Sequence, residues 1–303
     1  GHILGKNSLN ITAQYTHFTF HSSLDRSLDS SMPIGHRFYL LPQLTHSFSN
    51  VYGYIKSTIA ANTLADRADL AAINQHRSAF NKARSIPIFS VDSGTYLQRH
   101  LTFRKKTYTQ TLEPRLMYTY VPYRNQSQFP VFDTTTLPFS YNQVFSHNAF
   151  TGPDRLQNTS QIGFGLTSRV LSADDNSNVL TANLGMIRYF SPRRVCLTGP
   201  CTADNSKESP LDAVLSYTPT LHWSVSGTAA WNFKQRYIDN ASLSTNYNRD
   251  GRHVFNLGYQ FIHAAPGTAA TTSCLSNNTN LLSLGLAWPL GYHLTSVNYL
   301  YYN

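Results

Sequence analysis

The chain has 303 residues, of which 13% are aromatic and only 13% are charged, and its formal net charge is +9. The charged share is about half that of an ordinary soluble domain. No apolar run reaches the roughly 18 residues that a transmembrane helix needs. The basic surplus suits an anionic ligand or lipid, but the run Arg104–Lys106 predicts only a solvated turn, and no nucleic-acid-binding motif occurs.

The dominant pattern is an alternation of apolar and polar residues with a period of two, seen most clearly between Leu221 and Lys234. One set of positions reads Leu221, Trp223, Val225, Gly227, Ala229, Trp231 and Phe233. The intervening set is mostly Ser, Thr, His, Asn and Lys. Because strand side chains point alternately to opposite faces, this segment predicts a strand with an apolar and a polar wall.

The length of this alternation favours a membrane-spanning strand over a soluble one. Soluble strands average about 5–6 residues, whereas Trp223 to Phe233 would rise roughly 33 Å at about 3.3 Å per residue. A tilt of about 40° projects that rise to roughly 25 Å, the height of the apolar band of a membrane barrel. Aromatic residues stand at both ends, as the interfacial girdles of such barrels require.

The same pattern recurs along the chain and predicts about thirteen strands. Further strands are expected at 8–20, 36–48, 51–62, 86–102, 108–122, 161–170, 180–186, 210–218, 236–247, 255–261, 282–288 and 297–301. Short turns alternate with longer links, as in outer-membrane barrels. The link 63–85, rich in Ala, Asp, Arg and Gln, predicts a short helix.

These strands predict an all-β fold, an antiparallel transmembrane β-barrel. Bacterial single-chain barrels have an even number of strands, so an odd count predicts that residues 1–303 are one partial barrel domain within a larger barrel. A soluble β-sandwich is the remote alternative, and its strands should be shorter.

The sequence offers few chemical motifs. Cys196 and Cys201 lie five apart in one long link, and a local disulfide is expected there in an oxidising compartment, with pairing to Cys274 or free thiols as alternatives. The cysteine and histidine spacings match no zinc pattern. No nucleophile-elbow motif occurs. We therefore expect no metal, no cofactor and no enzymatic activity.

Several motifs in order carry a family resemblance. Residues 109–115 read TQTLEPR and residues 118–127 read YTYVPYRNQS, with Asp133 following. GLTSR at 165–169 and AWPL at 287–290, followed by YLYY at 299–302, continue the series. The chain resembles the LptD family of lipopolysaccharide-assembly proteins, most densely from about 108 to 190.

The resemblance implies a Gram-negative outer-membrane barrel that passes lipopolysaccharide to the outer leaflet and releases it sideways. It also implies a lipoprotein plug, LptE, inside the barrel and periplasmic Lpt bridge proteins that bind through an N-terminal jelly-roll domain, which is expected to be missing here together with the terminal barrel strands. The three cysteines do not match the family's disulfide positions.

Two groups of residues are candidates for contact with substrate or partner. Glu113 and Arg115 share one strand face, which should be the lumen; they contact LptE or a lipopolysaccharide headgroup, or else form a structural ion pair. Pro114 between them cannot donate a ladder hydrogen bond and predicts a bulge or a local distortion. Pro122 is expected to be structural.

Tyr123, Arg124 and Asp133 open the long link 123–158, which the resemblance places in or over the barrel mouth. A guanidinium suits phosphate, so Arg124 is a candidate headgroup contact; the alternative is loop packing with Arg124 held by Asp133. The leading functional hypothesis is a non-enzymatic lipopolysaccharide translocation pore. A passive porin-like channel and an outer-membrane hydrolase are the alternatives.

Overall fold

One antiparallel sheet makes up the fold. The structure, a computed structural model, describes residues 4–19, 33–70, 78–197, 202–263, 278–291 and 294–302. Its elements are β1 (Leu4–Phe18), β2 (Ile34–Asn50), β3 (Gly53–Leu70), β4 (Ser78–Thr95), β5 (Leu97–Phe103), β6 (Lys106–Val121), α1 (Tyr141–Val144), β7 (Thr159–Ser172), β8 (Asn178–Tyr189), β9 (Leu211–Thr220), β10 (Trp223–Asn232), β11 (Tyr237–Asn248), β12 (Val254–Ile262), β13 (Thr279–Pro289) and β14 (Thr295–Tyr302).

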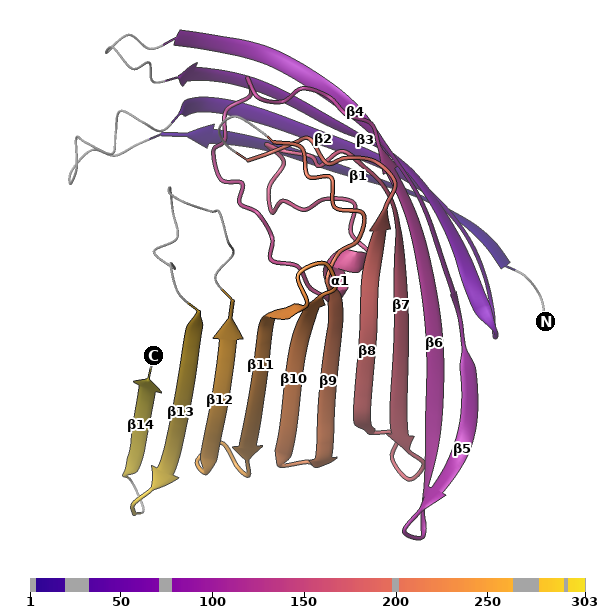
Figure 1. Ribbon diagram of the computed structural model, residues 1–303, viewed down its shortest axis with the longest axis vertical. Coiled ribbons are helices and arrows are strands. Elements are labelled where there is room, and N and C mark those ends of the chain that lie inside the picture. The colour runs from indigo at the N-terminus through magenta and orange to yellow at the C-terminus, as the bar shows by residue number, and fades with distance from the viewer. Residues whose placement is uncertain are drawn as a thin grey trace.

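The sheet is strongly curved, and its strands follow one another in chain order (Figure 1). The order runs from β1 to β14, except that β5 pairs only with β6. Among the described residues β1 and β14 form its two ends, so the sheet is open. The prediction of long antiparallel strands in an all-β barrel-type sheet is confirmed.

In the described residues the sheet holds fourteen strands, because the strand expected at 86–102 is divided into β4 and β5. The β4–β6 ladder ends where Gly94 faces Arg115, and the β5–β6 ladder begins where Leu97 faces Leu112. Tyr96 instead donates its backbone N–H to the carbonyl of Tyr52 at 2.8 Å. Near this break the sheet changes direction: β1–β4 arch over the concave side while β6–β14 stand side by side (Figure 1).

The helix expected within 63–85 is wrong for the described residues. β3 continues to Leu70 and β4 begins at Ser78, while residues 71–77 lie outside the described ranges. Leu64, Asp66 and Ala68 are buried at every second position. Burial on one face therefore has the period of a strand, and the pairing of β3 with β4 overrides the helix-favouring composition.

The convex face of the sheet is apolar. In β10, Trp223 and Trp231 are 40% and 39% exposed, whereas Ala230, on the opposite face, is 1% exposed. Large exposed apolar side chains continue on the neighbouring strands at Leu166, Leu184, Leu215, Leu243, Leu257 and Leu282. In the part of the chain that the structure describes, these side chains have no second sheet over them. No described helix has the length and apolarity to cross a bilayer.

Tight turns join the strands at one end of the sheet. Arg104 and Lys105, with φ values of 47° and 67°, form the β5–β6 turn. Two consecutive left-handed residues match the twist of a hairpin. The solvated turn expected for this cationic run is confirmed. The longer links leave from the opposite end (Figure 1).

A charge on the convex face should be far more costly than the same charge on the concave face. We expect Leu257→Arg to lower the free energy of unfolding in lipid bilayers by about 2–4 kcal/mol, since the charge would enter hydrocarbon. The matched control is Asn256→Arg on the same strand, which should change it by less than about 1 kcal/mol. Equal losses in urea titrations of the two variants would contradict this assignment of faces.

Candidate functional site: the polar concave face and its inner loop

Two ion pairs line the concave wall. Arg115 of β6 donates to Asp92 of β4, with Nη2 2.7 Å from Oδ2 and Nε 2.9 Å from Oδ1. Arg169 of β7 donates from Nη1 to both carboxylate oxygens of Glu113 at 2.6 Å. Glu113 and Arg115 therefore share the concave face, but each pairs with a neighbouring strand. Cross-strand pairs of this kind tie adjacent strands together on one face.

A polar cavity of about 350 Å³ lies against this wall. Its lining includes Glu113, Arg115, Arg169, Tyr54, Tyr141 and Asn183. Pro114 lies opposite the break between β4 and β5, where no ladder pairs are made on that side. Because proline lacks a backbone donor, it fits a position whose neighbour has left the ladder.

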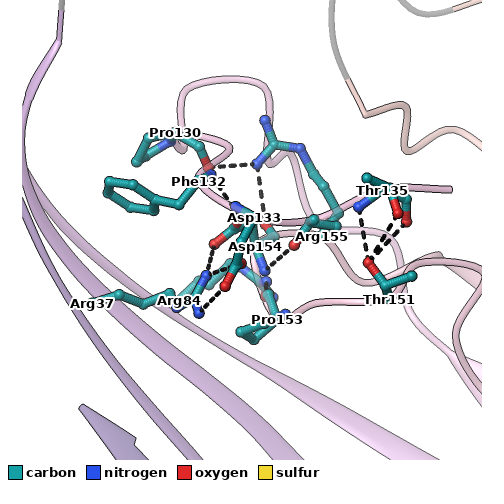
Figure 2. Close-up of polar contacts among 11 residues, drawn as sticks. Arg37, Arg84, Pro130, Phe132, Asp133, Thr135, Thr151, Pro153, Asp154 and Arg155 are labelled. Carbon is teal, nitrogen blue, oxygen red and sulfur yellow. Dashed lines mark hydrogen bonds and ion pairs between the residues drawn. The ribbon is translucent and has the colours of Figure 1, made fainter. Parts of the chain in front are cut away.

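The segment 122–158, here called the inner loop, lies on the concave side and is anchored to the N-terminal strands by a buried arginine (Figure 2). Nη1 of Arg37, in β2, donates to Oδ1 of Asp154 at 2.7 Å and to Oδ1 of Asp133 at 2.5 Å. Asp154 is fully buried, and its Oδ2 accepts backbone N–H groups of Phe132 and Asp133 at 2.8 and 3.2 Å. One carboxylate thus joins the loop to the wall and shapes the loop.

Two further arginines hold the loop, one from the sheet and one from within the loop itself. Arg84 of β4 donates to the carbonyl of Pro153 at 2.7 Å, and Arg155 donates to the carbonyl of Phe129 at 2.8 Å (Figure 2). Burial lowers the pKa of Arg155, and the negative charge of Asp154 partly offsets that effect. Charge-assisted hydrogen bonds to backbone carbonyls hold the loop where water is excluded.

Apolar contacts follow the same path. Phe129 of the inner loop packs on Leu64 and Ala68 of β3. Leu156 packs with Ile86 and other side chains of β3, β4 and β6. Part of the concave side of β3 and β4 is therefore covered by the inner loop, which completes two small apolar clusters.

The middle of the inner loop sits on glycines of β7 and β8. A Cβ on Gly163 would lie 2.4 Å from the carbonyl oxygen of Val144, and one on Gly165 would lie 2.3 Å from the Phe145 ring. The backbone N–H of Tyr141 also donates to Oδ2 of Asp212 at 2.8 Å. Glycine in these strands thus permits a close approach that any side chain would block.

The remaining candidate residues lie near the start of the inner loop. Pro122 directly follows the end of β6. Tyr123 and Arg124 are exposed, and the Tyr123 ring lies 5.5 Å from Cζ of Arg194. Asp133 binds Arg37, and the described residues contain no ion pair between Asp133 and Arg124. The alternative in which Asp133 holds Arg124 is therefore wrong, since Arg37 occupies both oxygens of Asp133.

Cysteine pairing remains a prediction. Cys196 is disulfide-bonded. Cys201 and Cys274 both lie outside the described residues. Among the described residues, no group of three or more His, Cys, Asp or Glu side chains is arranged to hold a metal ion.

Sequence reasoning missed the residues that anchor the inner loop. Arg37 and Asp154 are 117 positions apart, and nothing in the local pattern of either segment links them. The glycines did carry a signal, because Gly163 and Gly165 alternate within one strand where side chains normally pack. That signal indicates close approach of another segment without saying which one.

A curved antiparallel sheet with an apolar convex face, a charged concave face and an inward-folded loop defines a membrane β-barrel protein. The family model described as "LPS transport system D", LptD, matches residues 5–294. The chain belongs to the LptD family. The expectation drawn from the motifs is thereby confirmed.

Several relatives named LPS-assembly protein LptD match most of the chain. The chain is 40% identical to that of Coxiella burnetii over 89% of its length and 32% of that protein. It is 30% identical to that of Legionella pneumophila strain Lens over 97% of its length and 37% of that protein. It is 36% identical to that of Xanthomonas oryzae pv. oryzae strain MAFF 311018 over 75% of its length and 29% of that protein. The chain therefore spans about a third of the length of these relatives.

Removal of the anchoring arginine should release the inner loop. We expect Arg37→Ala to destabilise the docked loop by about 3–5 kcal/mol, because Asp154 would stay buried without its cation. Limited proteolysis within 123–158 measures the release. The control is Arg188→Ala, which breaks an exposed ion pair with Glu208 and should cost less than about 1 kcal/mol. An unchanged cleavage rate in the Arg37 variant would contradict the anchor.

The glycine seat gives a second, independent way to displace the loop. Gly163→Val should cost about 1–3 kcal/mol through overpacking against Val144 and should expose α1. The control is Gly227→Ala in β10, where the nearest atom to a new Cβ is 3.6 Å away. The measurement is the labelling rate of a cysteine introduced at Val144. Equal labelling rates in the Gly163→Val and Gly227→Ala variants would refute the close contact between the inner loop and Gly163.

Proposed function

We propose that this chain forms part of the wall of an outer-membrane translocon that inserts lipopolysaccharide into the outer leaflet without breaking a covalent bond. Membership of the LptD family is the observation that carries the proposal. In this proposal residues 1–303 are a partial barrel domain of a longer protein, and the terminal barrel strands and a periplasmic jelly-roll domain belong to the rest of it.

The two faces of the sheet suit the two halves of such a substrate. The concave face presents the Glu113–Arg169 and Arg115–Asp92 pairs, which offer hydrogen-bonding groups to sugars and phosphates. The convex face presents Leu and Trp side chains to acyl chains. Sugars thus pass along the lumen while acyl chains remain in hydrocarbon, and the energy for transport is supplied elsewhere.

The partners follow from the same proposal. An LptE-like lipoprotein plugs the lumen, and periplasmic Lpt bridge proteins deliver lipopolysaccharide through the jelly-roll domain. Tyr123 and Arg124 are exposed at the start of the inner loop, which makes them candidates for contact with the substrate or the plug. The inner loop, anchored at Arg37, narrows the lumen on this side of the barrel.

The expected outcome in cells is restored surface lipopolysaccharide. A Gram-negative strain depleted of its own LptD should regain surface display when the full-length protein is supplied with its lipoprotein partner, and quantitative surface labelling measures that gain. A passive porin-like channel would instead raise solute flux in liposomes and leave surface lipopolysaccharide at the depleted level. Turnover of lipid or peptide substrates by the purified protein would favour a hydrolase.

A further inference from the structure

A second cavity, of about 670 Å³, opens at the long-link end of the sheet. It lies between the described parts of the β8–β9 loop, residues 190–197 and 202–210, and the tight β10–β11 turn. This cavity shares no residue with the polar cavity at Glu113 and Arg115. Any ligand bound in this cavity would therefore be held by residues other than the ion pairs of the concave wall.

Cations outnumber carboxylates around this cavity. Arg188, Arg193, Lys207 and Lys234 line it, against Asp204 and Glu208. Each arginine is paired with one of those carboxylates. Within the described ranges, neither lysine makes an ion pair. Four cations against two carboxylates leave two positive charges in excess at the rim.

The backbone that carries the two lysines is held in place. The carbonyl of Lys207 accepts the N–H of Tyr189 at 2.8 Å, beside β8. The side-chain Oδ1 of Asn232 accepts the N–H groups of Lys234 and Gln235, both at 3.1 Å. The backbone of each lysine is thus fixed, one in the β8–β9 loop and one in the β10–β11 turn, so binding need not order the chain first.

The arginines are oriented as well. Cζ of Arg193 stacks 3.5 Å from the centre of the Tyr189 ring, and its Nη1 donates to the carbonyl of Ser206 at 3.2 Å. Burial raises the pKa of Asp204, but hydrogen bonds from Ser206 and Arg193 outweigh that effect and hold the pKa below its usual value. Asp204 therefore stays ionised and keeps this guanidinium in place.

Aromatic and neutral polar groups complete the lining. Phe139 and Phe233 offer ring surfaces, while Asn205, Ser206 and Gln235 offer amide and hydroxyl groups. Rings stack on the apolar C–H faces of a sugar, amides bind its hydroxyls, and ammonium groups bind an anion. A phosphorylated sugar combines all three features in one ligand.

We propose that this rim cavity binds a phosphorylated sugar, with Lys207 and Lys234 contacting the phosphate. The chemistry is the same whether the sugar phosphate is free or is the headgroup of a glycolipid. Only the glycolipid source rests on the proposed transport function.

The test compares ligands with and without phosphate on the full-length protein in detergent. The probes are glucosamine 6-phosphate, glucosamine, inorganic phosphate, and lipopolysaccharide before and after phosphatase treatment. We expect the double variant Lys207→Gln/Lys234→Gln to bind glucosamine 6-phosphate and untreated lipopolysaccharide about tenfold or more weakly, because two charge-assisted contacts are lost. The matched control is Lys105→Gln/Lys106→Gln on the opposite rim, which should bind as the parent does.

Equal binding of glucosamine and glucosamine 6-phosphate would overturn the proposal, as would equal loss in both double variants. Heat-modified mobility in electrophoresis checks that each variant is folded. Surface display of lipopolysaccharide is scored separately. Surface display of lipopolysaccharide without phosphate-dependent binding would overturn the proposed sugar-phosphate site and leave the transport function supported. Phosphate-dependent binding without surface display of lipopolysaccharide would overturn the transport function and support a site for free sugar phosphate.

Discussion

A backbone that lies in hydrocarbon must find all its hydrogen-bond partners within the protein. In this chain the ladders between adjacent strands meet that requirement, and they leave only two directions for side chains. One direction must be apolar, as Trp223 and Trp231 show, because it meets lipid. The other is free to carry charge. The positions of Glu113, Arg115 and the inner loop all follow from that division.

The inner loop adds a second constraint of a different kind. Removing Arg37 and Asp154 from water is costly, and the cost is offset only because every oxygen of Asp154 accepts a good hydrogen bond. A pair of this kind contributes little net stability, but it strongly disfavours other positions of the loop. Its value is in fixing where Asp133 and the residues around it lie.

The sequence was informative wherever a property repeats locally. Alternation predicted the strands and the apolar face, and short motifs predicted the family. It failed at 63–85, where composition favours helix and pairing with the next strand decides otherwise. It also failed at Arg37 and Asp154, because a contact across 117 positions leaves no periodic trace in either segment. Glycines such as Gly163 indicate that another segment lies close to the strand, but they do not indicate which segment it is.

The inner loop touches both ends of the stretch from β2 to β8, and this has a mechanical consequence. It is fastened to β2 through Arg37, and it rests on β7 at Gly163 and Gly165 and on β8 at Gly185. It therefore acts as a brace across the inside of the curve, so these strands resist being pried apart or sheared past one another. Pulling neighbouring strands apart should therefore cost least at a joint that the brace does not cross.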